Sequence, residues 1–366
     1  LHRDDYVTKL EHYRWYHLYG EGLPGDISHY HELKKLICNN YVIYSDGKFK
    51  TVRIWPRKSL HMCADETEYH ETVRQIAEVM KSTLGLSAQK WEPPAVAVTG
   101  GRDSKGSLAA SIHVKEKYQY FSYNSQPAEK VDCDAAEMIC KAVGVPHITY
   151  EIPLDKAVYP EYDLVRAILC VNSNRRYFNH NDIMKRIYLR KANPFDVEAK
   201  SWTSEIGRAF YYKRYGVQRM QKKCTARRVN AMNNIFLMNP ALMYATDARY
   251  RDYLRSTAYN EHMFNYDWSD IIDLEMRDSR WGADVLSCEH MFSHDVTVPY
   301  NNRHLSDLML MVPLADRIAD RTHIDFTHEL CPAIDATNIS VRDVAHNNKR
   351  MWMDKIYYFI TSVRLF

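Results

Sequence analysis

Glycine is scarce in this sequence, and so are several patterns that would assign a function at once. Only 12 of the 366 residues are glycine, which excludes a collagen-like chain. The composition, with 46% hydrophobic and 26% charged residues, also excludes a disordered chain. No run approaches the roughly 18–20 apolar residues that span a bilayer, and the first residues lack the apolar core of a signal peptide. We therefore expect a cytoplasmic globular protein with no membrane partner.

Cysteine, histidine and net charge exclude further function classes. The eight cysteines contain no C-x-x-C pair and the 17 histidines no H-E-x-x-H, so neither a zinc site nor a dithiol motif is indicated. A net charge of +3 is too small to predict a nucleic-acid partner by itself. We expect reduced, mostly buried thiols.

Patterning in the first half of the chain predicts a parallel α/β sheet. Apolar residues at helical spacing predict a surface helix over 66–84. After Pro93-Pro94, segments of strand and helix alternate: 95–98, 104–117, 118–124, 134–144 and 147–152. Such alternation is typical of parallel sheets with right-handed crossovers. Because residues 155–366 are predicted to be mainly helical, we expect an α/β fold with a helical carboxy-terminal part.

Two of the few glycines stand side by side after the first of these strands, in the stretch AVAVTGGRDSKGSLAAS (95–111). Glycine carries no Cβ, so an oxyanion can approach the backbone N–H groups, and the following helix adds the positive end of its dipole. Asp103 suits a Mg²⁺ ion that bridges phosphate oxygens. The stretch predicts a phosphate cradle, although neither G-x-x-x-x-G-K-[ST] nor G-x-G-x-x-G is present. A turn that binds nothing is the alternative.

The pattern [S/T]-G-G-x-D-S on a strand-to-helix turn resembles the PP-loop of the ATP pyrophosphatase superfamily, whose fold is adenine nucleotide alpha hydrolase-like. Members of that family cleave ATP between the α and β phosphates, form an adenylated intermediate and release pyrophosphate. The resemblance implies that ATP contacts Thr99, Gly100, Gly101 and Ser104. It also implies that Asp103 is a Mg²⁺ ligand.

Further stretches are similar to the synthetase half of asparagine synthetase and its β-lactam-forming relatives. They are NNYVIYSDGKFKTVRIWP (39–56), FSYNSQP (121–127), VDCDAAEMICKAVGVPH (131–147), TSEIGRAFYYKRYG (203–216) and VPYNNRHLSDLMLMVP (298–313). With the loop, the resemblance covers roughly residues 35–350. It implies that 1–60 is a remnant resembling the end of a glutaminase domain and that 61–366 is the synthetase domain.

The same resemblance implies roles for single residues. Tyr123 falls where the family lines the adenine pocket, and Glu205 aligns with the glutamate near the reacting amine, a general base or orienter. Lys349 is the candidate for the carboxy-terminal lysine that stabilises charge on the departing adenylate. Arg208 stands where the family has a second metal-binding aspartate. A guanidinium can neutralise the same pyrophosphate oxygens, but the exchange could equally mark a loss of catalysis.

The family's glutaminase half uses an amino-terminal cysteine as nucleophile, whereas residue 1 here is leucine and the first cysteine is Cys38. We therefore expect no glutamine hydrolysis by this chain. Ammonia would come from a partner chain or from solution, or the acceptor would carry its own amine.

The resemblance implies an ATP- and Mg²⁺-dependent, AMP-forming ligase that adenylates a small-molecule or peptide carboxylate and forms an amide. One alternative is modification of a nucleobase, because a basic, tyrosine-interleaved segment could hold a nucleic acid. Its cations are Arg208, Lys213, Arg214, Arg219, Lys222, Lys223, Arg227 and Arg228. The other is a non-catalytic subunit that binds ATP or a partner, which Arg208 keeps open.

Overall fold

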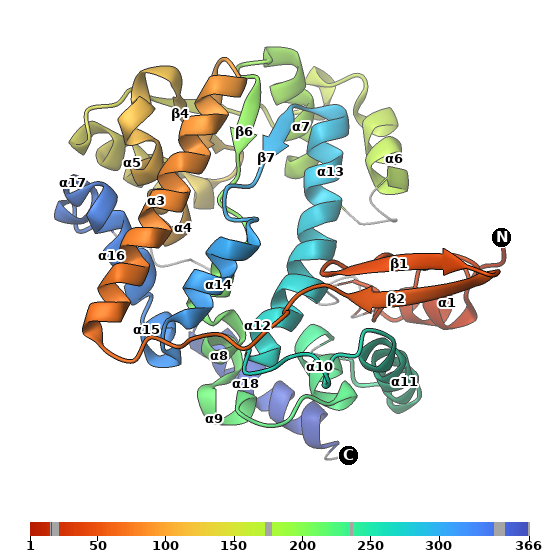
Figure 1. Ribbon diagram of the computed structural model, residues 1–366. Coiled ribbons are helices and arrows are strands. Elements are labelled where there is room, and N and C mark those ends of the chain that lie inside the picture. The colour runs from red at the N-terminus through yellow and green to blue at the C-terminus, as the bar shows by residue number, and fades with distance from the viewer. Residues whose placement is uncertain (15, 17–21, 173–177, 235–236, 340–347, 365–366) are drawn as a thin grey trace. The chain divides into compact units, whose positions relative to one another are not determined.

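The computed structural model divides the chain into two compact units, each assembled from segments far apart in the sequence (Figure 1). Unit 1 comprises Leu1–His61, Ala209–Ala283 and Asn347–Phe366, and unit 2 comprises Met62–Arg208 and Asp284–His346. The structure describes all residues except 15, 17–21, 173–177, 235–236, 340–347 and 365–366. The expected family domains, 1–60 and 61–366, stay a prediction.

Unit 2 is built around a five-stranded sheet in the order β5-β4-β3-β6-β7, and every neighbouring pair is parallel. The strands are β3 (Pro94–Ala97), β4 (Gln119–Asn124), β5 (His147–Glu151), β6 (Val197–Ala199) and β7 (Asp295–Thr297). The expected α/β class with a parallel sheet and a mainly helical carboxy-terminal part is confirmed. The first three strands coincide with the predicted segments, whereas β6 and β7 were not predicted.

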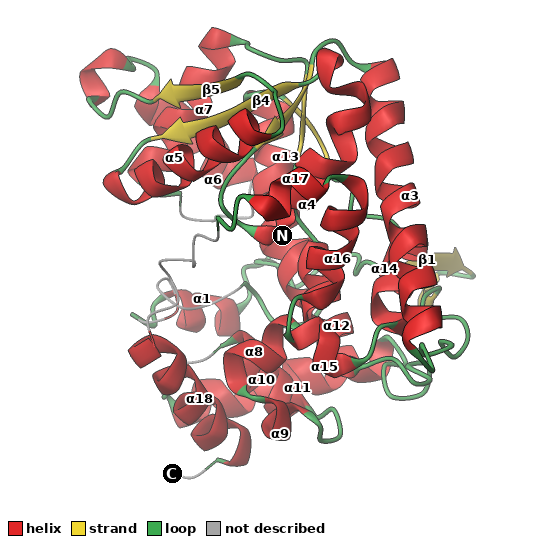
Figure 2. Cartoon of the chain, turned by 90° about the vertical axis from the view of Figure 1, so that its left-hand side faces the viewer, coloured by secondary structure: helices red, strands yellow, loops and turns green. Residues whose placement is uncertain are grey.

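Helices cover both faces of this sheet, because side chains on a strand point alternately to its two faces. Ala95 and Phe121 point to one face, where Leu189 of α7 packs against them. Tyr120 points to the other face, and its hydroxyl forms a hydrogen bond of 3.0 Å with Ser111 at the end of α4. Figure 2 shows α5 running beside β4 and β5. Burial on both faces explains the continuous small apolar run that forms β3.

The remaining elements of unit 2 are helical. They are α3 (Glu66–Lys90), α4 (Arg102–Ser111), η1 (Ile112–Lys117), α5 (Pro127–Ala142), η2 (Lys156–Val158), α6 (Tyr162–Asn172), α7 (His180–Ala192), η3 (Ser204–Arg208), α13 (Ala283–Phe292, which begins at the unit boundary), α14 (Arg303–Met311), α15 (Leu314–Ile318), α16 (Arg321–Leu330) and α17 (Pro332–Ala336). Among the described residues of both units, no helix combines the length and the apolar character needed to cross a membrane.

Unit 1 combines one β-hairpin with helices. Its elements are α1 (Asp5–Glu11), β1 (Asn40–Ser45), β2 (Lys48–Arg53), α8 (Phe210–Tyr215), α9 (Val217–Met220), α10 (Ala226–Asn233), α11 (Pro240–Ser256), α12 (Trp268–Ile272), the π-helix η4 (Asp273–Gly282) and α18 (Asn348–Val363). The hairpin turns at Asp46-Gly47, where both residues have positive φ (51° and 74°), as the type I′ turn expected from this dipeptide requires.

A buried ion pair anchors the base of the hairpin to the helices of unit 1. Arg53, the last residue of β2, donates to Glu275 of η4 through Nη1 (2.6 Å) and Nη2 (3.2 Å). Asn39 donates to the same carboxylate at 3.1 Å. The hydroxyl of Tyr253 also donates to this carboxylate. Glu275 is fully buried, so this pairing is what makes its burial tolerable.

Candidate functional site

The Thr-Gly-Gly turn lies at the carboxyl end of β3, the central strand of the sheet. The chain continues from β3 to β4 and β5 on one side and reaches β6 and β7 on the other, so the strand order reverses between β3 and β6. Open α/β sheets bind ligands at the carboxyl ends of strands, where the order reverses. The loop after β3 and the segment after β6 therefore flank the place where a ligand is expected.

The loop is held by a small set of hydrogen bonds. Ser104 Oγ accepts from the amide of Thr99 (3.1 Å) and lies 2.9 Å from its hydroxyl, and Thr99 Oγ1 accepts from the amide of Gly101 (3.1 Å). The amide of Gly100 donates to Asp132 Oδ1 at 3.3 Å. The side chains of Thr99 and Ser104 thus stabilise the turn by hydrogen bonds within the loop. Their contacts with ATP stay a prediction.

No side chain caps helix α4, whose N-cap residue is Gly101. The first intrahelical bond runs from the amide of Lys105 to the carbonyl of Gly101 (3.4 Å), so the amides of the preceding turn have no acceptor within the helix. Gly101 has an ordinary φ of −73°, which means that its backbone does not require glycine. The absence of a Cβ instead keeps a methyl group away from the turn, as a phosphate cradle needs.

Asp103, in the first turn of α4, forms an ion pair with Arg208. Nη1 of Arg208 lies 3.0 and 2.8 Å from the two oxygens of Asp103, and its Nε and Nη2 donate to Asp320 at 2.8 and 3.3 Å. Burial opposes the charge of Arg208, but the carboxylates of Asp103 and Asp320 outweigh it and raise the pKa of Arg208 above its ordinary value. The guanidinium is therefore a fixed cation beside the loop.

The turn after β6 also brings Glu205 to this cluster. Glu205 and Arg208 belong to the same short helix η3, and the charge of Glu205 contributes to the raised pKa of Arg208. Tyr300 donates from its hydroxyl to the carbonyl of Asp103 at 3.1 Å, and His323 places Nε2 at 3.8 Å from Asp103 Oδ1. Of the three expected catalytic residues, two thus lie with the loop.

The other two expected site residues are Tyr123 and Lys349. Tyr123 is at the end of β4, and the ammonium of Lys185 lies 3.9 Å from the centre of its ring. An adenine stacked on that face of the ring would replace Lys185. Lys349 is an exposed residue of α18 in unit 1, whereas the loop belongs to unit 2.

The basic segment divides between the units, since Arg208 belongs to unit 2 and the other seven cations to unit 1. Some of these cations donate hydrogen bonds within the protein: Arg208, Arg214, Arg219 and Arg228. Others are exposed: Lys222, Lys223 and Arg227. The exposed charge is smaller than the sequence suggested, and a nucleic-acid surface here stays a prediction.

Sequence reasoning missed the residues that support the loop from distant segments. Asp320, Tyr300 and His323 carry no local pattern, although Tyr300 lies in a stretch noted for its family resemblance. Lys105 is also buried beside the loop, where it donates to the carbonyl of Ile339, and burial followed by the charge of Arg102 lowers its pKa. No motif marks these positions.

The cluster fits a polyphosphate more simply than a directly bound metal ion. The α4 amides and Arg208 offer positive groups around the turn, as phosphate oxygens require. Mg²⁺ prefers oxygen ligands in octahedral geometry, and Asp103 and Asp320 supply such oxygens. Both carboxylates are already bound by Arg208, so a Mg²⁺ ion at Asp103 would share that carboxylate with the guanidinium or displace it.

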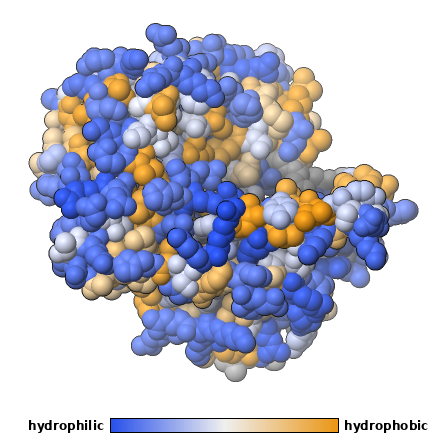
Figure 3. Space-filling view, in the orientation of Figure 1, coloured by the Kyte–Doolittle hydropathy of each residue, from blue (hydrophilic) through white to orange (hydrophobic). Residues whose placement is uncertain are grey.

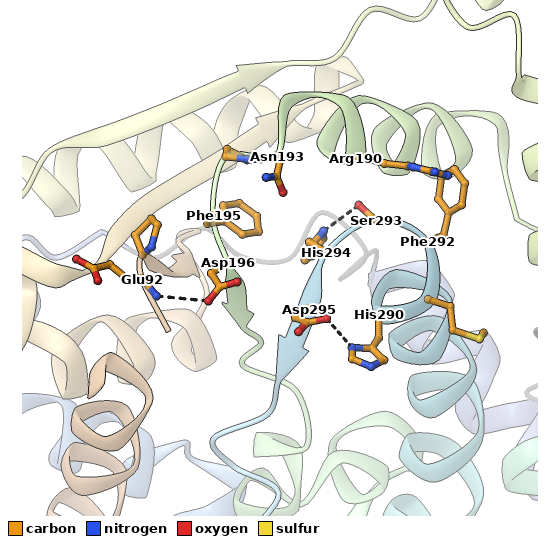
Figure 4. A pocket seen from close by; sticks show the side chains of 13 residues that line it. Glu92, Arg190, Asn193, Phe195, Asp196, His290, Phe292, Ser293, His294 and Asp295 are labelled. Atoms are coloured by element: carbon orange, nitrogen blue, oxygen red, sulfur yellow. Dashed lines mark hydrogen bonds and ion pairs between the residues drawn. The ribbon is translucent and has the colours of Figure 1, made fainter. Parts of the chain in front are cut away.

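A cavity of about 650 Å³ lies at the opposite edge of the sheet, before the amino ends of β3, β6 and β7 (Figure 4). His290 pairs with Asp295 at 2.9 Å on one side of it, and Asp196 accepts from the amide of Glu92 at 3.4 Å on the other. None of the expected site residues lines this cavity. We place the candidate site at the loop instead, because the reversal of strand order and the uncapped amides of α4 coincide there.

Behind this cavity is a buried ionic cluster with the donor set of a metal site. Ligand atoms of Glu198, Glu289 and His294 lie within 4.8 Å of one another. The ammonium of Lys200, however, lies 2.8 Å from Glu198 and 3.1 Å from Glu289. Burial lowers the pKa of Lys200, but the two carboxylates outweigh it and raise the pKa well above its ordinary value. Lys200 is therefore the cation that both carboxylates share, and Arg186 adds a second one to Glu289 at 3.4 Å.

No protein-family model matches the chain, and no curated protein shows significant sequence similarity to it. The functional argument therefore depends on the loop and the residues around it.

Proposed function

We propose that this chain is an ATP-dependent ligase of the PP-loop type that adenylates a carboxylate and converts it to an amide, releasing AMP and pyrophosphate. One observation carries the proposal: the uncapped amides of α4 and the guanidinium of Arg208 converge where the strand order of the sheet reverses. Preorganised positive groups of this kind stabilise the negative charge that develops on a leaving pyrophosphate.

The chain's own residues divide the work in two steps. In the first, the α4 amides and Arg208 hold the phosphates while a carboxylate oxygen of the acceptor attacks the α-phosphorus and pyrophosphate leaves. In the second, Glu205 orients the amine and accepts its proton as the amine displaces AMP. Tyr123 at the end of β4 borders the adenine. Bound Mg²⁺, held by Asp103, would supply further neutralisation of the phosphate oxygens.

The nitrogen enters as ammonia from a partner chain or from solution, or as an amine on the acceptor. All three give the same chemistry at the acyl carbon, because each attacks the mixed anhydride as a neutral amine. The acceptor is a small-molecule or peptide carboxylate. For Lys349 in unit 1, the role of stabilising the departing adenylate stays a prediction.

Analysis of the nucleotide products tests this proposal. The protein would be incubated with ATP labelled at the α-phosphate, Mg²⁺, an ammonium salt and a desalted metabolite extract. We expect AMP and pyrophosphate from the wild type and none from Asp103→Ala, whereas Asp134→Ala, which removes an exposed acid of α5, retains activity. ADP and inorganic phosphate as products would contradict α-phosphate chemistry.

A second candidate, a subunit that binds ATP or a partner without turnover, is favoured by the binding of Arg208 to two carboxylates. If the guanidinium stays with Asp103 and Asp320, it cannot serve a leaving group. The variant Arg208→Ala separates the two functions. A ligase loses AMP formation on this substitution, whereas in a non-catalytic subunit neither protein forms AMP and only the dissociation constant for ATP changes.

A further inference from the structure

Within the part of the chain that the structure describes, the hairpin of unit 1 has two free edges, because β1 and β2 pair only with each other. A two-stranded sheet is marginally stable in water, and the unpaired amides along its edges can pair with another strand. The Arg53–Glu275 ion pair fixes the base of the hairpin to the helices of unit 1.

The two edges differ in how they are protected. Strand β2 (KFKTVR) carries Lys48, Lys50 and Arg53, and lysine on an edge strand is a common guard against pairing. Strand β1 (NYVIYS) contains neither a charged residue nor a proline. The β1 edge is therefore the one that accepts a partner strand.

The register shows which amides this edge offers. Ser45 pairs with Lys48 next to the two-residue turn, so these two residues exchange hydrogen bonds and the pairs alternate from there along the ladder. On β1, the amides of Val42 and Tyr44 consequently point away from β2. On β2, the amide of Thr51, the partner of Val42, points away from β1.

The same residues form an apolar face. Val42, Tyr44 and Phe49 share one side of the hairpin and are 45%, 65% and 77% exposed. The rings of Tyr44 and Phe49 lie 4.8 Å apart between centroids. Figure 3 shows the apolar surface on this hairpin in orange. Large side chains exposed together in this way mark an interaction surface more often than a free one.

We infer that β1 pairs antiparallel with β1 of a second copy of this chain, which makes one four-stranded sheet across a two-fold axis. Val42 of each copy lies opposite Tyr44 of the other, and their outward amides and carbonyls exchange hydrogen bonds. Ile43 then lies opposite its own counterpart at the axis. This register joins the two apolar faces into one row and provides aromatic–aliphatic cross-strand pairs, which are stabilising.

The charge distribution allows β1, but not β2, to pair with the same strand of a second copy. Self-pairing of β1 places no like charges opposite each other, because the strand has none. Self-pairing of β2 would bring Lys48 and Lys50 of two copies together, which is unfavourable. A two-fold contact of this kind is the commonest closed assembly of identical chains.

A pair of proline variants on the two edges tests the inference by light scattering after size exclusion. Proline removes one outward amide and leaves the internal ladder intact at both Val42 and Thr51. We expect a dimer for the wild type and for Thr51→Pro and a monomer for Val42→Pro. A monomeric wild type at about 100 μM would overturn the inference, given the micromolar affinities of specific interfaces. Equal dissociation by both variants would overturn it too.

Cysteine cross-linking keeps the inference testable if Val42→Pro does not fold. Non-hydrogen-bonded antiparallel pairs have Cα atoms about 4.5 Å apart, which a disulfide can bridge. Mild oxidation should therefore convert Ile43→Cys to a covalent dimer. Lys50→Cys, next to Ile43 on β2, should show only the background of the wild type, oxidised in parallel because of its eight native cysteines. No excess cross-linking of Ile43→Cys would contradict the register.

Discussion

The guanidinium of Arg208 bridges the carboxylates of Asp103 and Asp320, with its shortest contact to each at 2.8 Å. One cation thus lies between two anions that the chain brings together from α4 and from the start of α16. The side chains of all three residues are 22–26% exposed, so solvent screens the cluster only in part. Because one positive charge faces two negative charges, Arg208 is the shared counterion on which both carboxylates depend.

Removal of the guanidinium should expose a divalent cation site. In Arg208→Ala, the two carboxylates face each other without a counterion, and oxygen ligands of this kind bind Mg²⁺ or Mn²⁺. We expect at least tenfold tighter binding of Mn²⁺ than in the wild type without nucleotide, measured by titration with detection of free Mn²⁺ by electron paramagnetic resonance.

Two further variants control this experiment. Arg208→Ala with Asp320→Asn should lose the gained affinity, because one of the two carboxylates is then neutral. Arg208→Lys, which keeps a cation, should remain close to the wild type. Equal Mn²⁺ affinities in the wild type and Arg208→Ala would show that the carboxylates do not form a site.

Two glycines of the loop region should respond differently to alanine. A Cβ at Gly106 would lie 2.5 Å from the hydroxyl of Tyr300 and 2.6 Å from the ring of Phe326, both in a packed interior. A Cβ at Gly101 would meet only Thr99 Oγ1, at 3.2 Å. Gly106→Ala should therefore lower the free energy of unfolding by about 1–3 kcal/mol, the usual cost of overpacking.

Gly101→Ala serves as the matched variant. Its backbone conformation suits alanine, so we expect nearly unchanged stability in urea denaturation. Because the added methyl group covers the turn, the dissociation constant for ATP should rise, which calorimetry would measure. A Gly101→Ala protein that is strongly destabilised, or that binds ATP as the wild type does, would contradict this use of the glycine.

The sequence predicted those parts of the fold that local patterns determine. Strand β3 and the turn after it are short and lie next to each other in the sequence, so neighbouring residues suffice to predict both. Strands β6 and β7 have three residues each and are too short to show an alternating pattern. Their place in the sheet follows from packing against distant strands.

The candidate site was predictable only in part for the same reason. Asp103, Glu205 and Arg208 belong to motifs, and the structure brings them together. Asp320 is 112 residues from Arg208 along the chain, and no pattern around it indicates the contact. A residue that acts through a long-range contact leaves no local signal, because only the fold places it.

Lys200 should be essential to the buried cluster behind the cavity. Lys200→Met leaves Glu198 and Glu289 without their shared cation, and loss of one partner of a buried ion pair costs about 3–5 kcal/mol of stability. We expect a lower melting temperature that Zn²⁺ partly restores, because His294 completes a three-residue donor set. Glu198→Gln with Lys200→Met should recover stability without Zn²⁺. Unchanged melting of Lys200→Met would show that the cluster is not stabilising.

His147 should make the stability of unit 2 depend on pH just below neutrality. Its Nε2 lies 2.9 Å from Ser122 Oγ, whose only hydrogen is donated to the carbonyl of Val98 at 2.6 Å, so Nε2 carries the proton of the neutral ring. Burial lowers the pKa of His147 below its ordinary value, and the charge of Glu137 opposes this only partly.

The sign of the effect follows from this depressed pKa. The unfolded chain takes up a proton at His147 near its ordinary pKa of about 6.5, whereas the folded protein resists it to lower pH. The free energy of unfolding should therefore be highest above about pH 6.5 and fall as the pH is lowered towards the folded pKa. Urea denaturation at pH 7.5, 6.5 and 5.5 would show a steeper loss for the wild type than for His147→Asn. If the wild type and His147→Asn lost stability equally as the pH is lowered, a group other than His147 would be responsible for the pH dependence. Since Val98 directly precedes the loop, the affinity for ATP should decline over the same interval in the wild type alone.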